Sequence, residues 1–276
     1  MSEGSTGGTA TTYDARFGGT LERGIRGDYR IAIGATLAEA WRLTRGFKRA
    51  VLLGLVVLAI VASVFVTVIA AMLSRLGYEL DSNAVQVLMI AMLVVAYPFL
   101  IGPMMMGVRQ AVALPVGPMM AFGYMNVAGP VIVASLAVTG LSNLGAFTLL
   151  VPELPGFVGL LLTPIGVYLA FAYALVVPLI ADRRLGPWRA METSRRAITR
   201  HWFSVALVLI ATALIWVLSA FPYAIGVGLL LATGKPLVLA LCLAAPLAIG
   251  VVWTLPMAII VVGILYRDVF GVTERA

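Results

Sequence analysis

Residues 203–231 read FSVALVLIATALIWVLSAFPYAIGVGLLL, a run of 29 residues without one charged side chain. A helix rises about 1.5 Å per residue, so about 20 apolar residues cross the roughly 30 Å hydrocarbon core of a bilayer. The run is therefore long enough to span a membrane. It also lacks the alternation of apolar and polar residues that marks the strands of a membrane barrel. This stretch predicts a transmembrane helix.

Five further stretches of the chain are also apolar and long enough to cross a bilayer. The predicted spans cover approximately residues 51–73, 84–108, 127–151, 156–181, 203–231 and 237–266. Continuous apolar runs favour helices, because a helix satisfies its own backbone hydrogen bonds inside lipid. The predicted fold class is all-α, a polytopic membrane protein with six transmembrane helices in residues 31–276.

The composition of the whole chain supports this prediction. Of the 276 residues, 62% are hydrophobic and 11% are charged, and the mean hydropathy is +1.05. Soluble proteins carry about 25% charged residues, so the composition excludes a cytosolic enzyme and a disordered chain. The single cysteine, Cys242, excludes an internal disulfide, and the single histidine, His201, excludes a histidine-based metal cluster.

Basic residues gather on one side of the predicted topology. With both termini in the cytoplasm, 17 of the 19 Lys and Arg residues fall in cytoplasmic segments, and Arg75 and Lys235 fall outside. This bias follows the positive-inside rule. The cytoplasmic segments contain 17 basic and 9 acidic residues, a net charge of +8. The outer segments contain 2 basic and 3 acidic residues, a net charge of −1, and the two together give the +7 of the whole chain. The charge is thus an orientation signal toward anionic lipid, and we expect no nucleic acid partner.

The segments before and between the spans carry the remaining predictions. Residues 1–30 are rich in small polar residues and predict a flexible cytoplasmic tail. Two basic amphipathic helices are expected at the membrane surface, one running into the span at 51–73 and one from Trp188 to Trp202. They either only anchor and orient their spans or form a docking surface. The candidate cytoplasmic lipid or partner contacts are Arg183, Arg184, Trp188, Arg189, Arg195, Arg196, Arg200 and Trp202.

Polar side chains inside the predicted spans are few. Ionisable groups near mid-depth, which proton relays and many transporters require, are absent from the predicted spans. A candidate intramembrane polar stripe remains, formed by Ser135, Thr139, Asn143 and Tyr168. Such side chains either line a substrate path or hydrogen-bond between helices.

Six methionines lie between residues 104 and 125. Thioether sulfur is a soft ligand that selects Cu(I), but methionine is also a flexible apolar filler, and no Cys or His lies beside this group. Catalytic constellations and phosphate-binding glycine loops are missing from the sequence. We therefore predict neither an enzyme nor a cofactor, and the metal affinity of the methionines stays open.

The second half of the chain carries a recognisable pattern. Its residues are Gly166, Tyr168, Leu169, Tyr173, Pro178, Leu179, Asp182, Arg183, Leu185, Gly186, Trp188, Ala190, Met191, Ser194, His201, Trp202 and the ending Tyr266 to Gly271. This pattern resembles the YciC-like family of bacterial multi-pass inner-membrane proteins. It is also distantly similar to the membrane domain of glycerophosphodiester phosphodiesterases. The resemblance implies a six-span fold in the inner membrane and no catalytic residue.

Two functions are compatible with these features. The first is a non-enzymatic inner-membrane protein, an accessory or scaffold component that contacts lipid, another membrane protein or a second copy of itself through the basic cytoplasmic helices. The alternative is a transporter or permease-like protein for a neutral or amphipathic small molecule or lipid, built around the polar stripe. A wet cavity lined by the four stripe residues would favour transport, and helix packing without such a cavity would favour association.

Overall fold

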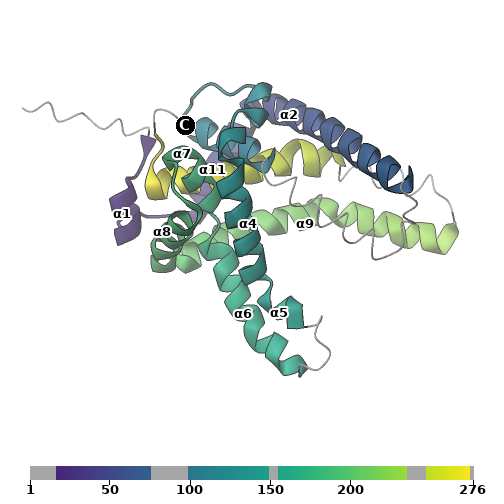
Figure 1. The fold of residues 1–276 in the computed structure, drawn as a ribbon. Coiled ribbons are helices and arrows are strands. Elements are labelled where there is room, and N and C mark those ends of the chain that lie inside the picture. Colours follow the sequence, from purple (N-terminus) through teal and green to yellow (C-terminus); the bar gives the residue numbers. More distant parts are fainter. Residues whose placement is uncertain (1–16, 76–98, 149–154, 235–246, 274–276) are drawn as a thin grey trace, which may run out of the picture.

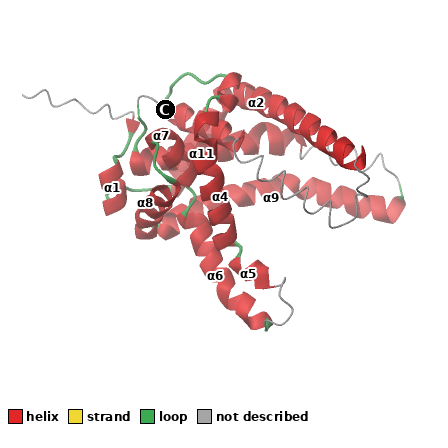
Figure 2. Ribbon diagram, in the orientation of Figure 1, coloured by secondary structure: helices red, strands yellow, loops and turns green. Residues whose placement is uncertain are grey.

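A computed structural model of the chain describes residues 17–75, 99–148, 155–234 and 247–273. Every regular element among these residues is a helix (Figure 2). The prediction of an all-α fold is confirmed for this part of the chain.

The elements follow one another without a strand in the described ranges. The α-helices are α1 (Leu21–Arg26), α2 (Ile33–Arg75), α4 (Ala128–Ser142), α5 (Leu144–Phe147), α6 (Gly156–Ala172), α7 (Val176–Arg183), α8 (Pro187–Arg200), α9 (Trp202–Thr233) and α11 (Leu255–Phe270). Residues 99–111 are also helical. The 3-10 helices η2 (Pro118–Phe122) and η3 (Met125–Val127) precede α4, and the π-helix η5 (Leu247–Thr254) precedes α11.

A packed hub forms one end of the molecule (Figure 1). It consists of α1, the start of α2, residues 99–112, α7, α8, the first turns of α9, and α11. Its fully buried side chains include Phe47, Ile198, Tyr266 and Phe270. Helix α11 packs against α1, α2 and α9, and it is apolar nearly all round, as a central helix must be.

Apolar arms extend from this hub. They are residues 52–75 of α2, residues 209–233 of α9, and the hairpin of α4, α5 and α6, which points away from the other two in Figure 1. Large apolar side chains on the arms are exposed, with Met72 at 62%, Leu160 at 75% and Leu231 at 82%. Soluble monomers rarely expose apolar surface on this scale. The arms are therefore the part of the molecule that suits a lipid environment.

Four helical stretches among the described residues are long and apolar enough to cross a membrane. They are Pro118–Ser142, Phe157–Arg183, Trp202–Thr233 and Ile249–Phe270. The second and third coincide with the predicted spans at 156–181 and 203–231. The first stretch begins nine residues before the span predicted at 127–151. It ends at Ser142, inside that span, because the helix breaks at Asn143. These stretches support a membrane-embedded protein.

The other predicted spans are described in part. The span at 51–73 lies inside α2, a single helix of 43 residues. The last predicted span continues to Phe270, beyond residue 266, and its residues 237–246 lie outside the described ranges. Residues 84–98 of the second span also lie outside them, whereas 99–108 are helical. The count of six spans therefore stays a prediction.

Part of the segment predicted to be a flexible tail is folded. The backbone N–H of Gly19 donates to the Arg267 carbonyl at 2.9 Å, and a Cβ added at Gly24 would lie 2.6 Å from the carbonyl oxygen of Val269. Tyr29 is buried, and its hydroxyl donates to the carbonyl of Ala197 at 2.9 Å. Residues 17–30 thus belong to the hub, because their glycines allow close backbone contact with α11. The prediction of a tail to residue 30 is corrected for this part, and residues 1–16 lie outside the described ranges.

The two amphipathic helices differ in form. The second is a separate helix, α8, with Pro187 in its first turn and a break at His201 before α9. The first is continuous with its span in α2. The apolar side of α8, including Ala190, Met191 and Ile198, is buried against the hub. Its apolar face therefore serves the protein core, and its basic face remains outside.

Candidate functional site

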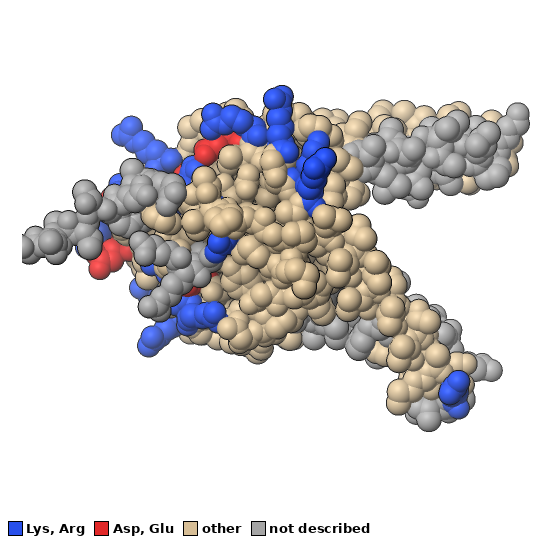
Figure 3. Space-filling view, turned by 90° about the horizontal axis from the view of Figure 1, so that it is seen from above, with Lys and Arg blue, Asp and Glu red and all other residues tan. Residues whose placement is uncertain are grey.

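The outer face of α8 and the turn before it form a basic surface. Arg184, Trp188, Arg189, Arg196 and Arg200 are exposed, and Trp188 is exposed to 77%. Figure 3 shows Lys and Arg side chains gathered over the hub and largely absent from the arms, apart from a blue patch at the tip of one arm. Most of the predicted lipid or partner contacts therefore lie on one exposed basic surface.

One carboxylate organises part of this surface. Glu192 accepts two hydrogen bonds from Arg195, each at 2.9 Å, and a third from Nε of Arg196. These hydrogen bonds lower the pKa of Glu192 to about 2, so the carboxylate stays ionised. Arg189 and Arg200 have no acidic partner within the described ranges. Arg184, which is also exposed, has no acidic partner there either, and these three arginines remain available to an anionic ligand.

Arg183 differs from its sequence neighbour Arg184. Its guanidinium donates to the carbonyls of Phe270 at 2.8 Å and Gly271 at 3.2 Å. These hydrogen bonds direct the Arg183 side chain toward the hub, and its contact with lipid or a partner stays a prediction. Arg184 ends α7 with a left-handed backbone (φ 55°) and is exposed.

Asp182 holds the end of the chain against α7. Its side chain is fully buried. It accepts a hydrogen bond from the Tyr266 hydroxyl at 2.7 Å and others from the backbone N–H and hydroxyl of Thr273. The Nε of Arg183 lies 3.5 Å from the same carboxylate. Tyr266 and Thr273 could not be predicted as its partners, because nothing local to residue 182 points to residues about 90 positions later.

A second charged cluster joins α11 to α2. Arg267 donates to Glu39 at 2.7 and 3.1 Å, to Asp268 at 2.8 Å and to the carbonyl of Ala111 at 2.9 Å. One guanidinium therefore connects α2, the end of the 99–111 helix and α11. This arrangement is typical of a structural clamp rather than of a catalytic centre.

The clamp predicts a pH dependence of stability. The hydrogen bonds from Arg267 lower the pKa of Glu39 from its usual value of 4.5. A carboxylate with a lowered pKa in the folded state stabilises the protein above its unfolded-state pKa, and this stabilisation is lost as the pH falls through the folded-state pKa. We expect the midpoint temperature of thermal unfolding of the wild type to decrease as the pH is lowered from 7 to 3.5. Glu39→Gln should start from a lower midpoint and show a smaller fall, whereas equal falls in both proteins would contradict the assignment.

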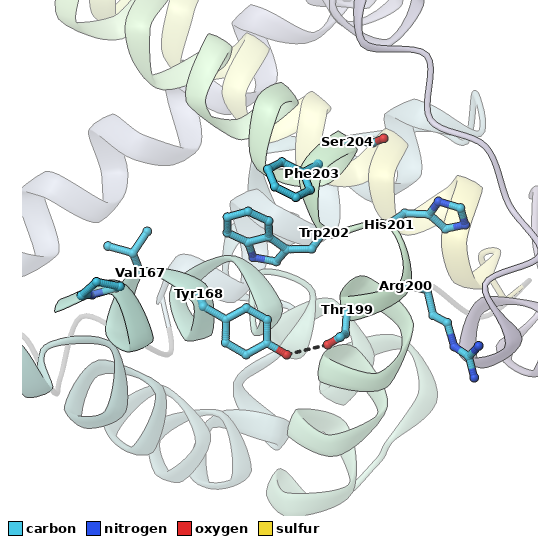
Figure 4. A pocket seen from close by; sticks show the side chains of 9 residues that line it. Val167, Tyr168, Thr199, Arg200, His201, Trp202, Phe203 and Ser204 are labelled. Carbon is cyan, nitrogen blue, oxygen red and sulfur yellow. Dashed lines mark hydrogen bonds between the residues drawn. The ribbon is translucent and has the colours of Figure 1, made fainter. Parts of the chain in front are cut away.

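A pocket of ≈ 610 Å³ lies where α6, α8 and α9 meet. Its lining residues are Pro164, Val167, Tyr168, Thr199, Arg200, His201, Trp202, Phe203 and Ser204. Figure 4 shows the rings of Tyr168, Trp202 and Phe203 arranged along one side, with the Tyr168 hydroxyl bonded to Thr199. The hydroxyl oxygens lie 2.7 Å apart. The indole Nε1 of Trp202 is buried and finds no acceptor among the described residues.

His201 is directed away from this pocket in Figure 4. Its Nε2 lies 2.8 Å from the Gly27 carbonyl oxygen, and its ring stands edge-on to Tyr29 at 4.8 Å between centroids. Burial raises the pKa of Tyr29 to about 12. His201 thus ties the break between α8 and α9 to the loop after α1.

The predicted polar stripe is divided in the structure. Ser135 is buried, and the side chain of Asn143 donates to the Thr139 carbonyl of its own helix at 2.8 Å. Asn143 lines a second pocket of ≈ 570 Å³ between α4, α5 and α6. Tyr168 instead lines the first pocket through its contact with α8. Neither of these two pockets is lined by all four side chains.

The methionines also occupy different environments. Met105 and Met106 are fully buried in the hub, whereas Met119 is exposed to 78%. Methionine acts here as core filler at the first two positions. Within the described ranges, no group of three or more His, Cys, Asp or Glu side chains could hold a metal ion. Cys242 lies outside those ranges.

Comparison of the chain with protein family models, with curated proteins and with solved structures finds no match. The resemblance to the YciC-like proteins is therefore untested.

Proposed function

We propose that the chain is a six-span protein of the bacterial inner membrane with both termini in the cytoplasm. It acts without chemistry of its own, as an accessory or scaffold component. It contacts lipid or a membrane-protein partner through the basic face of α8 and the adjacent turn. The observation that carries this proposal is the division of the molecule into a packed hub with outward arginines and apolar arms.

Two groups of charged residues in the hub support association. One group forms internal contacts that stabilise the fold, and the other faces outward, where a partner or lipid could bind. Asp182, Arg183, Glu39 and Arg267 are held in internal contacts between distant helices. Arg189 and Arg200, in contrast, face outward with no acidic partner in the described part of the chain. Exposed arginine beside an exposed aromatic side chain such as Trp188 is typical of interfaces.

Transport remains the alternative hypothesis. It requires a path that the polar stripe lines, and the separation of Ser135, Asn143 and Tyr168 between the core and two pockets gives no support for a single path. The geometry therefore favours association.

The association hypothesis predicts a retained partner or lipid after gentle extraction. The full chain is extracted in a membrane-solubilising polymer, and the co-purifying proteins and lipids are measured by mass spectrometry. We expect a stoichiometric membrane protein or enriched anionic lipid, reduced several-fold in the double variant Arg189→Glu, Arg196→Glu. The control is Arg75→Glu, which reverses a charge at the far end of α2 and should change nothing. A retained polar small molecule, with no enriched protein or lipid, would overturn the proposal in favour of transport.

A further inference from the structure

We propose that the base of the α2 arm binds one anionic phospholipid on its exposed face. The phosphate lies against Arg45 and Arg49, and an acyl chain follows the apolar side chains that come next on the same face. This inference rests on the proposed function, in which α2 enters the membrane from the cytoplasm, and it assigns a lipid site outside α8.

One exposed stripe runs along α2 from the hub into its arm. Its residues follow one another at intervals of three or four, the spacing of neighbours on one face of a helix. The exposed side chains of the stripe are Arg42, Arg45, Arg49, Leu53, Val56 and Ile60. The stripe therefore changes from basic to apolar within one unbroken helix, which Figure 1 shows leaving the hub.

The basic half of the stripe has little opposing charge. Glu39 is the single acidic residue of α2, and both of its carboxylate oxygens accept hydrogen bonds from Arg267. Arg42 interacts electrostatically with the same carboxylate. Arg45 and Arg49 have no acidic partner among the described residues. These two cations are therefore complementary to an anion, and each such residue near a membrane surface favours anionic lipid about fivefold.

Contacts with η5 fix which side of α2 is directed outward. Trp41 stacks on Trp253 at 5.4 Å between ring centroids, and Nζ of Lys48 lies 4.1 Å from the centroid of the same indole. Trp41 and Lys48 are about two helical turns apart, so they lie on one side of α2. Each residue rotates a helix by about 100°, which places Arg45 and Arg49 about 50° and 90° around the axis from that contact. The two arginines are therefore held beside the packed interface and not within it.

The same two arginines stand at the level of lipid headgroups when residues 51–73 span the membrane. Along the axis of the unbroken helix, Arg45 lies about 9 Å and Arg49 about 3 Å before residue 51. The headgroup layer extends roughly 5–8 Å beyond the hydrocarbon core on each side. The long side chains of both residues reach this layer, where the phosphates of the lipids lie.

A phospholipid matches both halves of the stripe. Its phosphate pairs with the arginines, and its acyl chain covers Leu53, Val56 and Ile60, each of which is more than half exposed. From residue 49 to residue 60 the helix advances about 16 Å, which is about the thickness of one hydrocarbon leaflet. Free phosphate or an acidic soluble protein would match the basic half and leave the apolar half uncovered. A zwitterionic lipid would bring a cation of its own to the arginines.

The test uses phosphatidylglycerol with a photoreactive diazirine in its acyl chain. The full chain in mild detergent is irradiated with this probe, and the adducts are mapped by peptide mass spectrometry. We expect adducts on residues 53–60 of α2. Unlabelled phosphatidylglycerol should suppress them at least fivefold more effectively than phosphatidylcholine, and inorganic phosphate should not suppress them. Absence of adducts from α2, equal competition by both lipids, or suppression by phosphate would each overturn the site.

Charge variants separate this site from α8. The double variant Arg45→Gln, Arg49→Gln removes both cations and should weaken competition by phosphatidylglycerol about 25-fold, the product of two fivefold effects. Arg45→Lys, Arg49→Lys keeps both charges and should compete nearly as the wild type does, so a loss confined to the glutamine variant comes from charge. The matched control Arg189→Gln, Arg196→Gln removes two exposed cations from α8 and should leave the α2 adducts unchanged.

Equal competition in the glutamine and lysine double variants would contradict a role for the two charges of α2. A loss of the α2 adducts in the α8 variant would likewise overturn a separate site on α2. If α2 gains no adducts while a partner or lipid still co-purifies in an α8-dependent way, the proposed function stands and only the α2 site fails.

Discussion

Replacing Gly263 by alanine is expected to lower the free energy of unfolding by about 3 kcal/mol, the cost of forcing extra volume into a packed interior. Gly263 lies on α11, opposite Gly107 of the 99–111 helix. A Cβ at residue 263 would lie 2.3 Å from the carbonyl oxygen of Gly107 and 2.4 Å from its carbonyl carbon. Backbone atoms cannot move aside as a flexible side chain can. The two helices must separate, and the buried contacts of Ile260 and Ile264 on the same helix loosen with them.

The measurement is thermal unfolding of the full chain in one detergent, followed by circular dichroism. A loss of this size should lower the midpoint by roughly 5–10 °C. The matched control is Gly228→Ala on α9, where an added Cβ meets no atom within 4 Å. Alanine is the better helix former by about 1 kcal/mol, so this control should be unchanged or slightly stabilised. Similar midpoints for the two variants would show that α11 and the 99–111 helix do not pack through their glycines.

Asp182→Asn is expected to destabilise the protein by about 3 kcal/mol, because it leaves buried donors and a neighbouring arginine without their charged acceptor. The carboxylate accepts from Tyr266 at 2.7 Å and from Thr273, and it lies 3.5 Å from Nε of Arg183. An amide of the same size offers one acceptor oxygen and brings its own donors. Those donors would face the Tyr266 and Thr273 hydroxyls or the guanidinium.

The readout for this variant combines the unfolding midpoint with protection of the last helix. We expect a lower midpoint and faster hydrogen exchange of the amides at the end of α11, because the residues after Gly271 lose their attachment to α7. Glu22→Gln is the control, since the Glu22 side chain is 85% exposed and 4.0 Å from Arg26. Exposed ion pairs contribute at most about 1 kcal/mol. An Asp182→Asn variant as stable as Glu22→Gln would refute the role of this carboxylate.

Features that depend on a single segment could be predicted from the sequence. The long apolar helix at 203–231 was predictable because each of its residues favours an apolar environment independently of the rest of the chain. Helix α8 was predictable because its apolar residues recur at helical spacing after Pro187. Both confirm that periodicity and hydropathy are sufficient when a long segment forms one helix.

Features that depend on distant segments could not be predicted. Arg183 and Arg184 are identical in chemistry and adjacent in sequence, yet one donates to carbonyls at the end of α11 and the other is exposed. The end of α7 turns the chain between them, and only the position of α11 decides which arginine is internal. The partner of Tyr168 could not be predicted for a related reason, because it is Thr199 on α8 and not a residue of α4.

The sequence by itself determined that this protein is all-helical, suited to a membrane, and basic on one side. These properties are sums over local segments, since transfer into lipid depends on the side chains of a segment and little on its neighbours. The tertiary structure decided which residues of the glycine-rich start join the hub, which arginines stay available, and where α6, α8 and α9 leave a pocket. These outcomes depend on the path of the backbone, because close contacts such as Gly107 with Gly263 join residues that no local pattern connects.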